Sequence, residues 1–521
     1  MVEASSATAA RTHGELCRLA DECWAQDQSR AALEAAWAAF DLAPDERTTK
    51  KLLTKLLRDY PTGLQPNRRA AYLKLLTDRE VEPYFIGAAG WQLLLRSYQL
   101  SEDAADAAFE ALVTVLENDE LALTLLREAP VCSVAAELLL SRLRRWLLVS
   151  GQWRRHPEFV AGLKAQTSLN GGAWPFDEIQ RGLLAQAGGS AMAPAYFLAG
   201  APKANSAFAA TNPVTRSVAA QYEGWPYPRW TRITLGEPMR LPDVIRAMDP
   251  DAAKALPVEA NMLVAGCGTG REAASVALRY PDVTVTAIDV SEASLDYARR
   301  QCAALGIGNT RFLKLDLHDV ARLNQRFHAI SCGGVLHHLP DPERGFKLLV
   351  DVLQPGGVMH IMVYSRLSRL RITGARTLIN DLMKQPVSDD LLRQVRQRFL
   401  ERPEHPLAAH ILRSWDFATL AGTHDLLLHR HEDPFDITRI KQALDNLELR
   451  LLSFQPPTRA AVARYDAMFP HDPRHQDFKS WAYFERSEVG GNYEFWCCTK
   501  PASPHRSRLA ALGKAQATEN S

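Results

Sequence analysis

The chain from residue 263 onward contains short apolar runs of strand length, and the first of them leads into a helical pattern. A helix that starts at Asp436 precedes a sixth run, and NYEFWCCTK at 492–500 is a seventh. Strands interleaved with helices predict an α/β fold. The first five predicted strands are LVAGCGTG at 263–270, VTVTAIDV at 283–290, RFLKLDL at 311–317, FHAISCGGVLHHL at 327–339 and LQPGGVMHIMVYS at 353–365.

Gly266, Gly268 and Gly270 alternate at the end of the first predicted strand. A residue without a Cβ lets the backbone turn tightly and approach a bound small molecule. Asp289 ends the second predicted strand, 19 positions after Gly270. A carboxylate there can accept hydrogen bonds from both hydroxyls of a ribose. The pattern therefore predicts a cofactor that contains a nucleoside.

Arg271 stands where a dinucleotide-binding loop needs its third glycine, which disfavours a nicotinamide enzyme. The compact G-x-G-x-G form, followed by the later strands in order, resembles class I S-adenosylmethionine (SAM) methyltransferases. The resemblance implies a Rossmann-like seven-stranded domain, SAM as the cofactor and methyl transfer as the reaction.

The same resemblance distributes the cofactor over the strand ends. Asp316 and Leu317 would frame the adenine, the second strand would hold the ribose, and the fourth would hold the methionine tail. Helix capping is the alternative role of both aspartates. Val264 and His328 depart from the wider superfamily, which has acidic residues there. The predicted cofactor residues are Gly266, Cys267, Gly268, Thr269, Gly270, Asp289, Val290, Asp316, Leu317, Cys332 and Gly333.

Residues 16–148 show helical patterns with few β-branched runs. In AALEAAWAAFDLAPDE, Ala32 and Ala39 precede Pro44 with the spacing of a tetratricopeptide helix. The stretch AELLLSRLRRWLLVSG at 136–151 predicts an amphipathic packing helix, with nucleic-acid binding by its arginines as the alternative. Helices of this kind can stack into a surface that binds a protein or peptide, or can serve as a stabilising platform.

The segment QYEGWPYPRW at 221–230 combines two prolines with four aromatic side chains. This composition predicts an extended segment laid over an apolar surface, because prolines exclude a regular helix or a central strand. Many SAM methyltransferases cover the cofactor pocket with a segment at this position. A structural staple without ligand contact is the alternative. The predicted catalytic residues here are Tyr222 and Glu223, and the predicted substrate contacts are Trp225, Tyr227, Arg229 and Trp230.

Methyl transfer is an in-line displacement, so the enzyme mainly aligns the acceptor and, for a hydroxyl or ammonium acceptor, removes a proton. His337 and His338 follow the fourth strand, and a neutral imidazole is a suitable base near pH 7. We predict His337 as the base and His338 as a substrate contact, with loop-bound histidines as the alternative. The N-P-P-Y motif of amide methyltransferases is absent, which disfavours adenine and glutamine acceptors.

Two insertions, 366–432 and 457–488, separate the last strands. We expect them above the substrate side of the sheet, because ligands bind at the carboxyl ends of parallel strands. The arginines after the fifth strand either attract an anionic substrate or form a solvated helix face. These arginines are Arg366, Arg369, Arg371 and Arg376.

In DLLLHRHEDPF, helical spacing places Asp425, His429 and Glu432 on one face. We predict Asp425 and His429 as substrate residues. A strand would instead pair His429 with His431 as metal ligands, but no further clustered ligand completes such a site. The sequence therefore predicts no metal.

Composition is that of an ordinary soluble protein, with 46% apolar residues, 23% charged residues and a net charge of +1. Such a charge gives no global field to attract nucleic acid or a membrane. Eight cysteines without a C-x-x-C pair favour a reduced compartment. No run of about 18 apolar residues and no secretory pattern is present. We therefore expect a cytoplasmic protein that binds neither nucleic acid nor membrane.

The motifs ELLLSRLRRWLL, YEGWPYPRW, LVAGCGTG, GVLHHL and DLLLHRHEDPF together resemble bacterial proteins in which a tetratricopeptide-type helical region precedes a SAM methyltransferase domain. The predicted function is methyl transfer from SAM to an unidentified acceptor, with a protein or peptide bound by the N-terminal helices. A SAM-binding regulator without turnover is the alternative. The expected parts are a helical domain at 1–195, a linker and cofactor-covering segment at 196–260, the methyltransferase domain at 261–501 and a disordered tail at 502–521.

Overall fold

The computed structural model describes residues 11–100, 105–186, 212–487 and 491–499. The first part of the predicted linker, 196–211, and the predicted tail lie outside these residues. The chain forms two compact units, and each of them is assembled from three segments. The helical unit consists of 1–207, 220–237 and 370–430, and the sheet unit consists of 208–219, 238–369 and 431–521.

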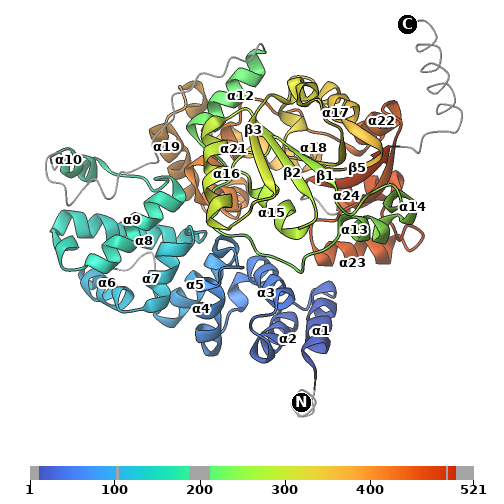
Figure 1. Cartoon of the computed structure of the whole chain (residues 1–521). Coiled ribbons are helices and arrows are strands. Elements are labelled where there is room, and N and C mark those ends of the chain that lie inside the picture. The colour runs from blue at the N-terminus through green and yellow to red at the C-terminus, as the bar shows by residue number, and fades with distance from the viewer. Residues whose placement is uncertain (1–10, 101–104, 187–211, 488–490, 500–521) are drawn as a thin grey trace, which may run out of the picture. The chain divides into compact units, whose positions relative to one another are not determined.

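The sheet unit is built on a seven-stranded mixed sheet with the order β3-β2-β1-β4-β5-β7-β6 (Figure 1). Neighbours among β1 to β5 pair in parallel, whereas β7 is antiparallel to both β5 and β6. This order confirms the seven-stranded Rossmann-like sheet predicted for this part of the chain. The strands are β1 (Asn261–Ala265), β2 (Thr284–Asp289), β3 (Thr310–Lys314), β4 (Phe327–Gly333), β5 (Leu353–Val363), β6 (Leu449–Phe454) and β7 (Tyr493–Thr499).

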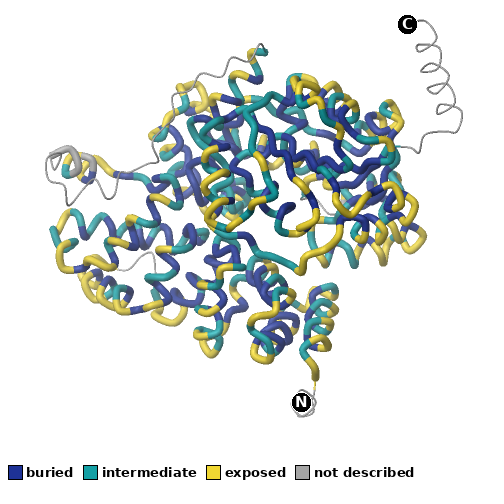
Figure 2. Tube along the Cα trace, viewed as in Figure 1, coloured by how far each residue is buried: buried dark blue, intermediate teal, exposed yellow. Residues whose placement is uncertain are grey.

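Apolar side chains alternate between the two faces of the sheet, as the two-residue period of a strand requires. In β1, Leu263 and Ala265 belong to one core, and Met262 and Val264 belong to the other. The central strands are buried over most of their length (Figure 2). The helices of this unit include α13 (Leu241–Met248), α14 (Pro250–Ala253), α15 (Arg271–Arg279), α16 (Glu292–Ala304), α17 (Pro342–Asp351), α22 (Ile437–Asn446), α23 (Arg459–Met468) and α24 (Phe478–Ser487).

The fourth strand ends earlier than the sequence predicts. β4 stops at Gly333, because Gly334 has a φ of +75° and turns the chain into the short 3-10 helix η6 (Leu336–His338). The histidine pair therefore lies on this helical turn, after the strand.

The helical unit confirms the helical prediction for the N-terminal region, while its tetratricopeptide assignment stays a prediction. The predicted amphipathic helix is α8, and its arginines all have partners within the unit: Arg142 pairs with Asp106, Arg145 with Asp177, and Arg144 donates to the carbonyl of Pro175. Helices α1 to α10 are α1 (His13–Ala25), α2 (Ser29–Leu42), α3 (Arg47–Asp59), α4 (Arg69–Thr77), α5 (Pro83–Ser97), α6 (Phe109–Glu117), α7 (Glu120–Glu128), α8 (Val134–Ser150), α9 (Pro157–Asn170) and α10 (Glu178–Gln186).

The first insertion belongs to the helical unit, whereas we assigned it to the domain at 261–501; its position above the substrate side of the sheet stays a prediction. Its helices α19 (Asp389–Leu400), α20 (Pro406–Leu412) and α21 (Leu420–Leu428) share one hydrophobic core with the N-terminal helices. The physical reason is their apolar side chains, such as Phe399 and Leu427, which are fully buried in that core. Two of the unit boundaries fall within α12 (Pro213–Gly224) and α18 (Arg366–Arg376).

A buried ion pair joins the insertion to α8. Nη2 of Arg396 on α19 donates to both carboxylate oxygens of Glu137, at 2.5 and 2.6 Å. The guanidinium also donates to the carbonyl of Ala173 and lies over the ring of Phe417. Arg396 is fully buried and Glu137 is nearly so, so each charge depends on the other for compensation.

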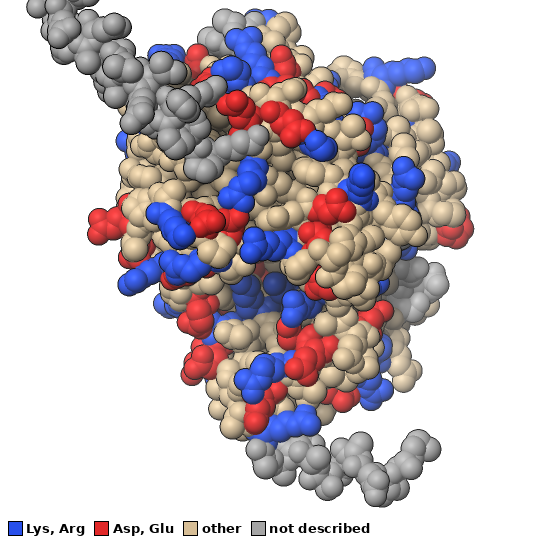
Figure 3. Space-filling view, turned by 90° about the vertical axis from the view of Figure 1, so that its right-hand side faces the viewer, with Lys and Arg blue, Asp and Glu red and all other residues tan. Residues whose placement is uncertain are grey.

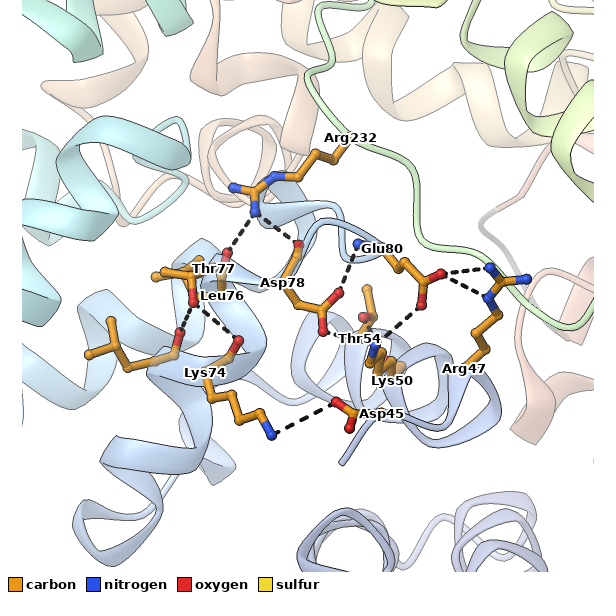
Figure 4. A network of polar contacts seen from close by, with 11 residues as sticks. Asp45, Arg47, Lys50, Thr54, Lys74, Leu76, Thr77, Asp78, Glu80 and Arg232 are labelled. Atoms are coloured by element: carbon orange, nitrogen blue, oxygen red, sulfur yellow. Dashed lines mark hydrogen bonds and ion pairs between the residues drawn. The ribbon is translucent and has the colours of Figure 1, made fainter. Parts of the chain in front are cut away.

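A second polar network holds the segment that follows the aromatic stretch (Figure 4). Nη1 of Arg232 donates to the carbonyls of Leu76 and Asp78, at 3.2 and 2.9 Å. Close by, the ammonium group of Lys50 on α3 lies between the carboxylates of Asp78 and Glu80. Arg232 also forms an ion pair with Glu128 on α7, so the segment at 220–237 is tied to the N-terminal helices by charge.

Opposite charges are interspersed over the face of the molecule in Figure 3, where neither sign gathers into a patch. Among the described residues, no helix is both long enough and apolar enough to cross a membrane.

The neighbouring strands β5 and β7 carry a titratable pair, His360 and Glu494, whose side chains meet at 2.9 Å. Burial lowers the pKa of His360, but the hydrogen bond and charge of Glu494 outweigh it and raise the pKa overall. Burial likewise raises the pKa of Glu494, and His360 lowers it overall. The raised pKa of His360 adds to the free energy of unfolding, and this contribution is complete below the unfolded pKa of about 6.5. The lowered pKa of Glu494 also adds to it, and that contribution is complete above the unfolded pKa of about 4.3.

We therefore expect His360→Gln to lower the free energy of unfolding by about 0.5–1 kcal/mol near pH 5.5, since the carboxylate is half exposed. The loss should shrink as the pH rises through the raised pKa of His360, because the folded and unfolded imidazoles are then both neutral. Urea denaturation of both proteins from pH 5 to 8 measures this. A difference that stays constant with pH would contradict the assignment.

Candidate functional site

The glycine loop follows β1 with all three of its glycines in the left-handed region. The φ angles of Gly266, Gly268 and Gly270 are +67°, +51° and +81°. A Cβ on Gly266 would lie 2.3 Å from Val335, and one on Gly270 would lie 2.5 Å from Ala298. We expected these two glycines to make room for a ligand. The structure shows that the fold itself requires them, because a Cβ at either position would clash with a neighbouring residue.

Asp289 ends β2 and holds the glycine loop. Its Oδ2 accepts the Gly268 N–H at 2.7 Å, and its Oδ1 accepts the Ser291 N–H at 2.9 Å. The predicted alternative, helix capping, is supplied by Ser291 at the start of α16, and Asp289 supports that residue. A carboxylate can accept about four hydrogen bonds, so this role is compatible with ribose binding. The contact places Gly268 N beside the predicted ribose carboxylate.

Asp316 caps the 3-10 helix η5 (Leu317–Leu323) and accepts hydrogen bonds from the backbone and ring of His318. Burial alone would raise the pKa of Asp316, but the contacts with His318 lower it overall. The side chains of Cys267 and Cys332 are buried in the two sheet cores, and burial raises the pKa of Cys332 to about 12. These cysteines can meet a cofactor only through their backbones.

Among the remaining predicted cofactor positions, Thr269 and Leu317 are buried, Val290 is half-buried and Gly333 is exposed. The structure thus gathers the ends of β1, β2 and β4 at one edge of the sheet, as the sequence predicts. A loop with three left-handed glycines beside a buried carboxylate fits a small nucleoside-containing cofactor.

His337 and His338 are buried on η6 next to the end of β5. Nδ1 of His337 accepts the Tyr364 N–H at 3.2 Å, and the two rings stack with centroids 3.8 Å apart. Nδ1 of His338 donates to the carbonyl of His431 at 2.8 Å. Both rings are oriented by the fold, and when His337 is neutral its proton lies on Nε2. The base assignment stays a prediction.

The comparison with protein families finds a match to the methyltransferase domain over residues 262–357. This range begins in β1 and ends in β5, so it includes the glycine loop, Asp289 and Asp316. Residues 262–357 are therefore similar to a methyltransferase domain, and SAM stays the predicted cofactor.

An uncharacterized protein of Synechococcus sp. is 32% identical over 211 residues, 38% of this chain and 49% of its own length. The ubiquinone biosynthesis O-methyltransferase of Coxiella burnetii is 31% identical over 127 residues, 24% of this chain and 53% of its own length. The chain thus spans about half the length of these curated relatives. The solved structure of PKMT2 from Rickettsia typhi with AdoHcy has a TM-score of 0.39 and 18% identity, over 50% of this chain and 53% of its own.

Outside the methyltransferase domain, the helical unit gathers three of the predicted site residues. The Tyr222 hydroxyl donates to Asp425 Oδ1 at 2.7 Å and lies 3.2 Å from His429 Nε2. Asp425 and His429 are both buried. The predicted third member, Glu432, is absent from this group because α21 ends at Leu428; it pairs instead with Arg369 in the sheet unit.

The aromatic segment differs in part from the prediction of an extended chain. Its first four residues, 221–224, are the last turn of α12, because the prolines begin only at Pro226. Trp225 donates to Asp389, Tyr227 donates to Asp416, and Arg229 donates to the carbonyl of Ser168. Glu223 and Trp230 are buried. The structure therefore shows the stapling contacts, while the substrate roles stay predictions.

Three of the four arginines after β5 bind to groups of the protein, so they do not form a cluster of unpaired positive charges for an anionic substrate. Arg366 pairs with Asp436, Arg369 with Glu432, and Arg376 donates to the carbonyl of Leu427. Arg371 is exposed, in keeping with a solvated helix face.

Sequence analysis missed one carboxylate near the methyltransferase domain, Glu485 on α24. It meets Ser365, which is 120 positions away in the sequence, and Tyr493, which is 8 positions away. Only the pairing of β5 with β7 brings these positions together.

Proposed function

We propose that the protein is a SAM-dependent methyltransferase that acts on an acceptor still to be identified. When bound, SAM supplies a methyl group on a positively charged sulfur, so that the protein has to align the acceptor and remove a proton. The contact of Gly268 N with Asp289, within a loop of three left-handed glycines, is the main support for this proposal. The name of one relative, an O-methyltransferase, favours a hydroxyl acceptor.

The chain's own residues would divide the work as follows. Backbone from Gly266 to Gly270 would bind the methionine end, Asp289 with Val290 would bind the ribose, and Asp316 with Leu317 would flank the adenine. Cys332 and Gly333 would contact the methionine tail through their backbones. His337 would take the proton from the acceptor, which requires Nδ1 to release the Tyr364 N–H or the ring to carry its own proton on Nδ1 in place of Nε2.

Calorimetry on Asp289→Ala tests the cofactor site. We expect SAM binding to weaken by about 1.5–3 kcal/mol, the usual contribution of hydrogen bonds to a charged group. Asp282→Ala is the matched control, because Asp282 is an exposed carboxylate of the same unit. Equal SAM affinity in wild type and Asp289→Ala would remove Asp289 from the site.

Turnover is tested by incubating the protein with methyl-labelled SAM and a cell extract, and by asking whether label enters macromolecules or small molecules. Label transfer would support the proposed activity. SAM binding without any transfer would favour the alternative, a regulatory protein that binds SAM without turnover.

We also propose that the helical unit binds the acceptor or a protein partner and that Tyr222 and Glu223 take part in turnover. Tyr222→Phe should lower kcat by about tenfold or more, because Asp425 loses a hydrogen-bond donor, and should leave SAM affinity unchanged. Tyr483→Phe, at an exposed ring, is the control. Unchanged turnover in Tyr222→Phe would reduce the aromatic segment to a structural element.

A further inference from the structure

A pocket opens at the carboxyl end of β5, within the sheet unit. Leu367, Trp481, Phe484 and Tyr493 form much of its wall. The three aromatic side chains are more than nine-tenths buried. The pocket therefore has the apolar walls that small-molecule sites usually have.

The pocket lies at the same edge of the sheet as the glycine loop. Both follow the carboxyl ends of parallel strands, and only β4 separates β1 from β5. Two strand spacings amount to about 10 Å. Tyr364, which contacts His337, directly precedes Ser365 in the pocket wall. The pocket is thus beside the predicted cofactor site and the predicted base.

One carboxylate supplies the charge of this pocket. Oε1 of Glu485 accepts hydrogen bonds from the Ser365 hydroxyl at 2.9 Å and from the Tyr493 hydroxyl. Among the residues that the structure describes, no Lys or Arg forms an ion pair with Glu485, and no donor reaches its Oε2. Two hydroxyl groups hold this carboxylate among aromatic rings, where its negative charge is complementary to a cation. The faces of the aromatic rings attract a cation as well.

We propose that this pocket, and not the helical unit, binds the methyl acceptor, and that the acceptor is a small amine whose apolar or aromatic body can also carry the hydroxyl group favoured above. The ammonium group contacts Glu485 Oε2, and the body lies against Trp481 and Phe484. The inference rests on the methyl-transfer function proposed above, and it names the class of molecule that this function uses.

Two probes that differ only by an ammonium group test the proposal: tyramine and 4-ethylphenol. Calorimetry without SAM should show that tyramine binds about tenfold more tightly or better, the usual effect of a charge-assisted hydrogen bond. Glu485→Gln should abolish this preference by weakening tyramine alone. Glu259→Gln, at an exposed position of the same unit, should keep it. Leu367→Trp should weaken both probes by filling the pocket.

Equal affinity for the two probes, no binding of tyramine, or an unchanged preference in Glu485→Gln would overturn the proposal. Unchanged binding in Leu367→Trp would place the probe elsewhere and overturn it as well. SAM binding is measured separately on the same protein samples. A protein that binds tyramine through Glu485 but does not bind SAM would contradict the methyltransferase function and leave the amine pocket standing.

Discussion

Replacement of Gly268 by valine is expected to abolish SAM binding, with a dissociation constant raised about a hundredfold or more. The φ of Gly268 is +51°, a region in which a β-branched residue is strained by about 1–3 kcal/mol. Relief of that strain would also pull the Gly268 N–H away from Asp289. Titration calorimetry with SAM measures the loss directly.

Gly306→Val is the matched control for this experiment. Gly306 has a φ of +69°, and a Cβ there meets no atom within 4 Å, so the variant carries similar strain outside the loop. It should lose comparable stability and keep its SAM affinity within about twofold. Equal loss of SAM binding in both variants would mean that general destabilisation explains the effect, and the loop assignment would lose its support.

Arg396→Met is expected to destabilise the helical unit by about 3–5 kcal/mol, because Glu137 would be left buried without its counter-charge. Denaturant unfolding followed by far-UV circular dichroism measures this loss. The sheet unit does not contain either residue, so SAM affinity at low temperature should stay close to that of the wild type.

The double variant Arg396→Met with Glu137→Leu separates charge from packing. Replacing both partners by apolar side chains removes the uncompensated carboxylate, so most of the lost stability should return. A double variant as unstable as Arg396→Met would show that packing around α19, and not the buried charge, causes the loss.

The sheet could be predicted because each of its strands is marked by a short stretch of neighbouring residues. Each strand is a short apolar run, and Asp289 and the three glycines occur at the ends of strands that the sequence marks clearly. The early end of β4 was missed, since the apolar GVLHHL continues the pattern while Gly334 breaks the backbone geometry. The sequence also did not show that a Cβ at Gly266 or Gly270 would clash within the fold, because the residues it would meet, Val335 and Ala298, come from other elements.

The helical unit was harder to predict because its contacts are long-range. Nothing local in the sequence around Arg396 shows that its partner is Glu137 on α8, so the insertion was assigned to the wrong part of the fold. The spacing of Asp425 and His429 did predict neighbours, and the structure brings both to Tyr222. The same spacing failed for Glu432, since the helix ends at Leu428.

The interleaved segments of the two units set an order of assembly during synthesis. The core of the helical unit includes residues up to Leu428, so it cannot close until most of the chain has left the ribosome. At about 5–20 residues per second, the N-terminal helices wait roughly 10–60 s for α19 to α21. During that interval Glu137 and the apolar side chains around it face solvent. The nascent chain therefore exposes a surface that chaperones recognise, and the last strands of the sheet are translated only after the helical unit is complete.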